Sequence, residues 1–128
     1  RKNLIRRSGE NISAMEVESV LLQHPAVAAA GVTAVPDELR GDEVLACIVL
    51  APGASVAEEA EARARAIVEF CLARLAYYKA PGYVAFCATL PLTPTEKIQR
   101  GQLGALGRRL LGEGACVDTR EMKKRVPA

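Results

Sequence analysis

The hydrophobic positions in the first quarter of the chain change their spacing from strand-like to helical. Residues 3–12 form two short runs around Ser8-Gly9, where glycine permits the positive φ that a tight hairpin turn needs. Residues 13–16 form a Ser-x-x-Glu capping box, and the apolar positions that follow recur at helical spacing. The pattern predicts an N-terminal β-hairpin followed by a short helix.

Two apolar runs in the middle of the chain, 27–35 and 44–50, predict strands that pair antiparallel across a turn marked by proline and glycine. Residues 55–58 form a second capping box, which opens a predicted helix over 56–75 with one apolar face. A third strand is predicted over 83–90 and a short helix over 99–111.

These elements predict an α+β fold: a small three-stranded sheet packed with helices, plus the N-terminal β-hairpin. We expect residues 1–111 to form the domain. Residues 112–128 are polar and basic without a clear period, so we expect a tail that is partly disordered or lies on the surface.

Composition narrows the possible functions. The chain has 128 residues, enough for one core, and its net charge of +2 with only five aromatic residues argues against nucleic-acid binding. No apolar run approaches the ~20 residues that span a bilayer. Four cysteines without a CxxC pair, with one histidine, predict no metal site; we expect buried thiols in a reducing cytoplasm.

The segment Pro91-Leu92-Thr93-Pro94-Thr95-Glu96-Lys97-Ile98-Gln99-Arg100 carries the main chemical signal. It places Lys97 after a Pro/Thr-rich loop, where a lysine is a mobile point cation for an anionic site. The segment resembles the Pro-x-Thr-x-Thr-Gly-Lys-Ile-x-Arg signature of acyl-CoA synthetases and other adenylate-forming enzymes. Glu96 stands where that family usually has glycine.

Other segments resemble the same family in the same order. They are Lys2-Asn3-Leu4-Ile5, Ser8-Gly9-Glu10-Asn11-Ile12, His24-Pro25-Ala26-Val27, Val35-Pro36-Asp37 with Gly41-Asp42-Glu43-Val44, and Leu75-Ala76-Tyr77-Tyr78-Lys79-Ala80-Pro81. The resemblance covers about residues 1–106 and points to the C-terminal domain of an acyl-CoA synthetase.

The resemblance implies a role for particular residues. Lys97 is expected to act in adenylation, Lys2 to be the hinge about which the domain rotates, and Ser8, Gly9 and Glu10 to line the CoA tunnel. The ATP and Mg²⁺ sites and the acyl pocket are expected in a large N-terminal domain, the partner of this one. This domain alone should therefore not catalyse the conversion of a carboxylic acid to its CoA thioester.

Two alternatives remain open at this stage. One is the corresponding domain of a peptide-synthetase adenylation or luciferase-like enzyme; the other is a stand-alone, non-catalytic α+β ligand-binding module. Several charged residues are interpreted as structural: Glu16 as a helix cap, Glu18 as a helix-surface charge, His24 as a charge at a helix end, and Arg100 as an anchor of the Lys97 segment. Arg6 and Arg7, next to the hairpin turn, are candidates to attract CoA phosphates, and a solvated basic edge is the alternative interpretation.

Overall fold

The structure is a computed structural model that describes residues 4–54 and 59–124. Its first element is the predicted hairpin, formed by β1 (Leu4–Arg7) and β2 (Glu10–Ser13) in antiparallel register. Ser8 and Gly9 have φ of 51° and 82°, and two successive positive φ values are typical of the tight turns that match the twist of a hairpin. The predicted N-terminal hairpin is confirmed.

The centre of the fold is a sheet around β4 (Gly41–Leu50). β3 (Val27–Asp37) pairs antiparallel with β4 along its length, as predicted, and β5 (Tyr83–Phe86) pairs parallel with β4 on its other edge. The predicted three-stranded sheet corresponds to these strands. In the part of the chain that the structure describes, the sheet has six strands, because the hairpin joins β4 through Arg7 and Gly41, and β6 (Val117–Asp118) pairs with β5.

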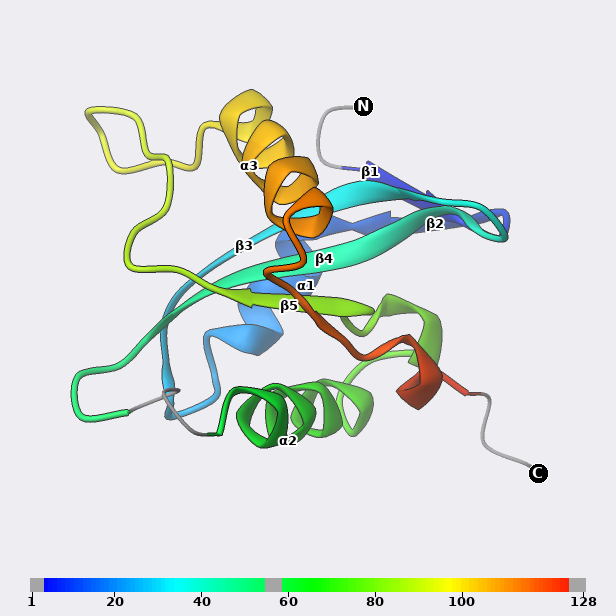
Figure 1. The fold of residues 1–128 in the computed structure, drawn as a ribbon, viewed down its shortest axis with the longest axis horizontal. Helices are drawn as coiled ribbons and strands as arrows, with labels where there is room; N and C mark the ends of the chain where they lie inside the picture. Colours follow the sequence, from blue (N-terminus) through cyan, green and yellow to red (C-terminus); the bar gives the residue numbers. More distant parts are fainter. Residues whose placement is uncertain (1–3, 55–58, 125–128) are drawn as a thin grey trace.

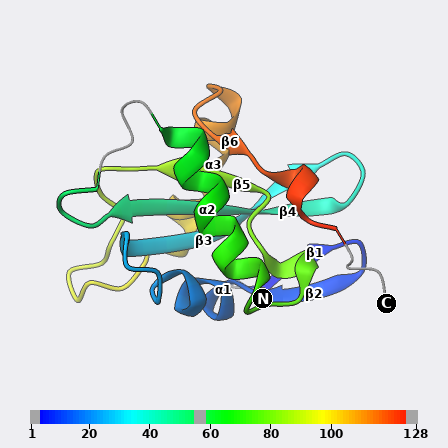
Figure 2. The ribbon, with the colours of Figure 1, turned by 90° about the horizontal axis from the view of Figure 1, so that it is seen from below.

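Within the described residues, three α-helices cover the two faces of the sheet. α1 (Ala14–Leu21) and α2 (Ala60–Leu72) lie on one face, and α3 (Arg100–Gly112) lies on the other (Figure 1). Two short 3₁₀ helices, η1 (Tyr77–Lys79) and η2 (Arg120–Met122), lie in the connections. α2 follows β4 and precedes β5 in the chain, so it lies in the connection between these two parallel strands. Figure 2 shows this helix crossing one face of the sheet.

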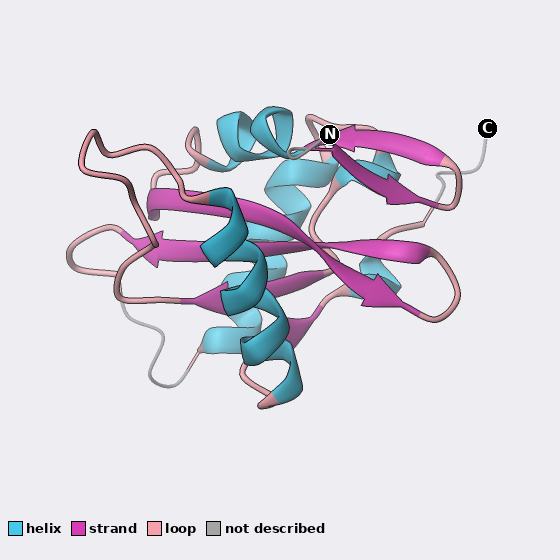
Figure 3. Cartoon of the chain, turned by 90° about the horizontal axis from the view of Figure 1, so that it is seen from above, coloured by secondary structure: helices cyan, strands magenta, loops and turns pink. Residues whose placement is uncertain are grey.

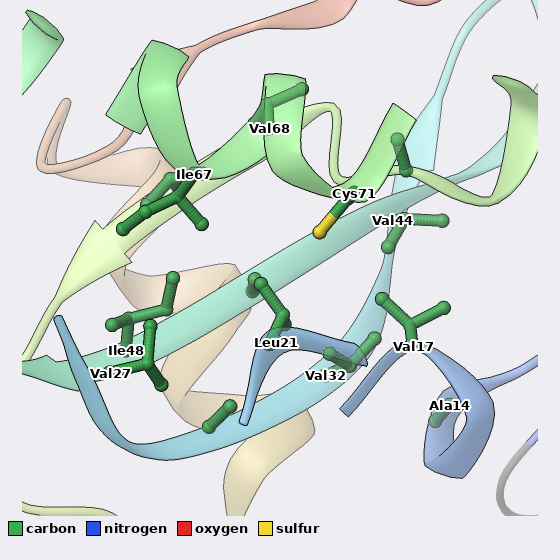
Figure 4. Packing of buried hydrophobic residues seen from close by; sticks show 14 of the residues in the cluster. Ala14, Val17, Leu21, Val27, Val32, Val44, Ile48, Ile67, Val68 and Cys71 are labelled. Atoms are coloured by element: carbon green, nitrogen blue, oxygen red, sulfur yellow. The ribbon is translucent and has the colours of Figure 1, made fainter. Parts of the chain in front are cut away.

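β4 is buried on both faces, which explains why its sequence is a continuous apolar run without alternation. Val44, Ala46 and Ile48 face α1 and α2, where they join the main core, part of which is drawn in Figure 4. Leu45 and Cys47 face α3 and join a second, smaller core on the opposite side of the sheet.

Some predicted boundaries were wrong. The third strand ends at Phe86 and not at Leu90. α2 begins at Ala60, and its N-cap Glu59 makes no side-chain capping bond; the predicted capping box at 55–58 lies outside the described residues.

The predicted tail is largely part of the fold. Residues 112–124 end α3, add β6 to the sheet and form η2, so the domain boundary expected at 111 lies too early. The buried Thr119 explains why, since its hydroxyl donates to the Pro81 carbonyl at 2.9 Å and its N–H donates to the Gly82 carbonyl at 2.8 Å. Long-range bonds of this kind leave no periodic signal in the segment itself.

Candidate functional site

The Lys97 loop, residues 91–99, is a small hairpin held by its own backbone. Leu92 and Ile98 form an isolated antiparallel bridge, and the Thr93 N–H donates to the Lys97 carbonyl at 2.7 Å. The Thr93 hydroxyl accepts from the Lys97 N–H at 3.0 Å, and the Glu96 N–H donates to the Thr93 carbonyl at 2.8 Å. The loop therefore closes a tight turn immediately before the lysine.

Glu96 occupies the left-handed region with φ of 64°. A three-residue hairpin loop places its third residue in this region, which is most favourable for glycine. The turn thus keeps the backbone that a glycine would adopt, although a glutamate occupies the position. A non-glycine residue there costs about 1–2 kcal/mol of local strain.

The side chain of Lys97 is exposed at the end of this turn. Within residues 4–54 and 59–124 its ammonium group makes no hydrogen bond or ion pair, and Glu96 does not pair with it. The loop presents a cation on an ordered backbone, free to meet an anion supplied from outside the domain.

The C-terminal base of the loop is fixed by a partly buried ion pair. Arg100 binds Glu18 through two bonds, Nη1 to Oε2 at 2.6 Å and Nη2 to Oε1 at 2.8 Å. Glu18 also accepts the Val32 N–H at 2.8 Å. This confirms Arg100 as an anchor, whereas the interpretation of Glu18 as a surface charge was wrong: the residue is 7% exposed. Its spacing from the buried Ala14 and Leu21 placed it on the inner face of α1.

The second candidate segment is the turn of Ser8, Gly9 and Glu10, in which all three residues are exposed. A Cβ added to Gly9 would meet nothing within 4 Å, so a larger residue at this position would not clash with the rest of the domain. Its φ of 82° does favour glycine. Lys2, the predicted hinge, lies outside the described residues.

The structure does not bring the two candidate segments together. The Lys97 loop lies at one end of the long strands, and the turn of the β1–β2 hairpin lies at the other end (Figure 3). Of the two arginines next to the turn, Arg7 is buried and donates from Nε to Glu43 Oε1 at 3.0 Å, so it does not face a ligand at the surface. Arg6 is exposed and donates from Nη1 to Asn11 Oδ1 at 3.0 Å.

Other charged residues of the sequence motifs have structural partners. The Ser13 hydroxyl accepts the Glu16 N–H at 3.3 Å, which confirms half of the capping box, but the Glu16 carboxylate binds Lys79 Nζ at 3.0 Å. His24 accepts the Ala26 N–H through Nδ1 at 3.0 Å, and burial lowers its pKa. The lowered pKa disfavours the charged imidazole that the predicted interaction of His24 with a helix end requires.

The cysteines are free thiols: Cys47 and Cys71 are buried, whereas Cys87 and Cys116 are partly exposed. A hydrogen bond from Cys47 lowers the pKa of Cys87 to about 7, and burial raises the pKa of Cys71 to about 12. The described residues contain no group of three or more metal-binding side chains. None of the described helices is long and apolar enough to cross a bilayer.

Comparison with known proteins identifies the family. A model of the AMP-binding enzyme C-terminal domain matches residues 16–97, which include most of α1, the strands β3, β4 and β5, and the Lys97 loop as far as the lysine. The chain belongs to the AMP-binding enzyme C-terminal domain family. The match confirms both the α+β fold class and the resemblance that the motifs indicated.

Several relatives of this domain are CoA ligases. The mitochondrial medium-chain acyl-CoA ligase of Danio rerio is 40% identical over 87% of this chain. An acyl-CoA synthetase from Brucella canis superposes with a TM-score of 0.75 at 38% identity over 81% of this chain. The o-succinylbenzoate CoA synthetase of Bacillus subtilis, solved with an acyl-adenylate intermediate, superposes with a TM-score of 0.70 at 41% identity over 80%.

The match covers only a small part of each relative. The chain spans 17% of the Danio rerio protein, 19% of the Brucella canis chain and 20% of the Bacillus subtilis chain. In these proteins the domain is one part of a much longer enzyme, so the activity of a whole enzyme goes beyond what this domain contains.

Proposed function

We propose that this chain is the mobile C-terminal domain of an AMP-forming acid–CoA ligase. Lys97 serves the adenylation of a carboxylic acid, and the turn of Ser8, Gly9 and Glu10 serves the transfer of the acyl group to CoA. The observation that carries the proposal is the position of these two segments at opposite ends of one domain. A domain built this way presents one end or the other to a single active site, but not both at once.

In the first half-reaction, a carboxylate oxygen attacks the α-phosphorus of ATP and pyrophosphate leaves, which produces an acyl-adenylate. Negative charge is spread over the attacking oxygen and the phosphoryl oxygens during this step. The Lys97 ammonium stabilises that charge without a proton transfer, and it is available because it has no partner within the described part of the chain. Losing one such contact typically costs about 10²–10³ in rate.

In the second half-reaction, the CoA sulfur attacks the acyl carbon, loses its proton and displaces AMP. The Gly9 backbone, exposed and without a side chain, allows the thin pantetheine arm to pass close to the main chain. Lys2, two positions before Leu4 in the sequence, is proposed as the hinge between the two orientations. Hinge residues absorb changes of backbone angle and need not contact substrate.

The partners in this proposal are a large domain of the same enzyme, the carboxylic acid, ATP and CoA. Mg²⁺ is assigned to the large domain, because no acidic cluster in the described residues offers ligands for it. The names of the relatives favour CoA as acceptor over the peptide-synthetase and luciferase-like alternatives, and their length disfavours a stand-alone module. A cytoplasmic location stays a prediction.

The test of Lys97 uses the full-length protein that contains this chain, with Lys97→Ala. We expect acid-dependent pyrophosphate exchange to fall at least about 100-fold, while thioester formation from a supplied acyl-adenylate changes little. Lys124→Ala, which removes an exposed lysine elsewhere, is the matched control and should leave both half-reactions intact. Exchange at the normal rate in Lys97→Ala would refute the proposed role.

The test of the turn compares Gly9→Leu with Gly53→Leu. Both glycines have positive φ, 82° and 90°, and neither would bring a Cβ within 4 Å of another atom, so the two variants carry similar backbone strain. We expect only Gly9→Leu to slow thioester formation, by about tenfold or more, with pyrophosphate exchange retained. Equal effects of the two variants would show that strain alone accounts for the loss.

A further inference from the structure

The C-terminal segment 115–124, here called the strap, runs along the β5 edge of the sheet and reaches the hairpin end of the domain. It pairs with β5 at Val117 and Asp118, and Figure 2 shows it continuing, in orange to red, beside the end of β4 that lies next to the hairpin. The strap lies outside residues 16–97, which the family model matches. It is therefore a feature of this chain that the family match does not explain.

A buried ion cluster joins the strap to the hairpin. The Lys123 side chain is fully buried and donates from Nζ to Glu43 Oε2 at 2.5 Å, while Arg7 donates from Nε to Glu43 Oε1 at 3.0 Å. Glu43 is 1% exposed, and its Oε2 also accepts the Val44 N–H at 2.8 Å. The link thus runs from the strap through β4 to Arg7, the residue directly before the Ser8–Gly9 turn.

The same turn is tied to the β3–β4 turn, which the strap also contacts. The Ser8 N–H donates to the Arg40 carbonyl at 2.8 Å, and Arg40 Nη1 donates to the Ser8 hydroxyl at 3.2 Å. The Asp37 carboxylate accepts the Arg40 N–H at 2.9 Å, and Arg120 of the strap binds Asp37 at 3.0 Å. Two routes, one buried and one at the surface, therefore connect the strap with Ser8.

A buried ion cluster of this kind contributes little net free energy to folding, although it contains three charged groups. Two cations share one carboxylate in a space shielded from water, and apolar residues of similar volume are often as stabilising as a buried ion cluster. Burial outweighs the attraction of Glu43 and lowers the pKa of Lys123 to about 8. The cluster does fix the relative positions of the strap, β4 and Arg7, because each buried charge needs its partners within bonding distance.

We propose that the strap positions the Ser8–Gly9 turn for thioester formation, and that Lys123 is a positioning residue acting through Glu43 and Arg7. This inference rests on the proposed role of the turn in binding CoA. It predicts that loosening the strap impairs the second half-reaction and leaves the first unchanged, because the Lys97 loop lies at the far end of the domain.

The experiment uses the full-length protein with Lys123→Met, which keeps an unbranched chain in the buried space and removes the charge. We expect the KM for CoA to rise about tenfold, with pyrophosphate exchange within about twofold of the unmodified protein. Hydrogen exchange at residues 5–12 should also increase. Lys124→Met, one residue further along and exposed, is the matched control and should change none of these quantities.

A second variant guards against misfolding of the first. Arg120→Met cuts the surface route and leaves the buried cluster intact, and we expect a rise of about threefold in the KM for CoA. The inference is wrong if both half-reactions decline together, which would indicate a general loss of structure. It is also wrong if Lys123→Met and Arg120→Met leave thioester formation unchanged while Gly9→Leu slows it. If Gly9→Leu has no effect on that step, the proposed role of the turn fails and the inference fails with it.

Discussion

The anchor of the Lys97 loop makes a quantitative prediction about Arg100→Met. The Arg100 guanidinium holds Glu18 with two bonds, and the Glu18 side chain is 9% exposed against 21% for Arg100. In the variant, the carboxylate keeps only the Val32 N–H as a donor among the bonds described above. Removing one partner of a buried pair costs about 3–5 kcal/mol, and the partial exposure of Arg100 places the expected loss at about 2–3 kcal/mol.

The assay is urea unfolding of the 128-residue chain followed by far-UV circular dichroism. The matched control is Arg109→Met on the same helix, which breaks an exposed pair with Glu113 at 3.2 Å and should cost no more than about 0.5 kcal/mol. Combining Arg100→Met with Glu18→Gln should cost less than the sum of the single changes, by about 1 kcal/mol or more. An Arg100 variant as stable as the Arg109 variant would refute the reasoning.

Three further predictions concern other parts of the domain. Gly82→Ala should destabilise the chain by about 2 kcal/mol, because its Cβ would lie 2.5 Å from Cδ of the buried Glu43; urea unfolding measures this. Glu96→Gly should stabilise the chain by up to about 1 kcal/mol by relieving the positive φ, in the same assay. Iodoacetamide at pH 7 should alkylate Cys87 before Cys71, since its pKa is about 7 against about 12. Mass spectrometry should show the Cys87 rate falling as the pH drops below 7, where its thiolate becomes protonated.

Each of these predictions has its own control. Gly101→Ala, with nothing within 4 Å of the added Cβ and a helical backbone, should stabilise by about 0.5–1 kcal/mol. If Gly82→Ala also stabilised the chain, the short distance between its Cβ and Glu43 would not be destabilising, and the prediction would be wrong. The control for Glu96→Gly is Thr95→Gly in the same turn, which should destabilise the chain by about 0.5–1 kcal/mol. If Thr95→Gly stabilised the chain instead, relief of the positive φ at Glu96 would not explain the effect of Glu96→Gly. Equal labelling of Cys87 and Cys71 would contradict the pKa difference.

Local signals predicted much of the fold correctly. The Ser8-Gly9 turn, the cap at Ser13 and the antiparallel pairing of β3 with β4 all depend on residues close together in the sequence. The loop around Lys97 is of the same kind, because its turn is closed by bonds between residues 92 and 98. Elements that are stabilised by bonds between neighbouring residues can be predicted from the sequence without knowledge of their tertiary contacts.

Predictions failed where a residue's role depends on a distant partner. Glu18 is a buried ligand of Arg100, 82 positions away, and Lys123 is buried against Glu43, 80 positions away. Thr119 fastens β6 to the sheet through Pro81, 38 positions earlier. A charged residue alone predicts a solvated surface position, and only the partner that offsets its burial changes that expectation.

The sequence by itself determined the family, the α+β class and the turn that presents Lys97, because motifs and short-range hydrogen bonds depend on residues adjacent in the chain. The tertiary structure alone decided that the Lys97 loop and the Ser8–Gly9 turn lie at opposite ends. It also decided that residues 115–124 add an edge strand to the sheet and reach the hairpin. Those features arise from how strands pair and which faces helices cover. These contacts join segments that are far apart in the sequence, and the order of segments along the chain does not determine which of them pack together.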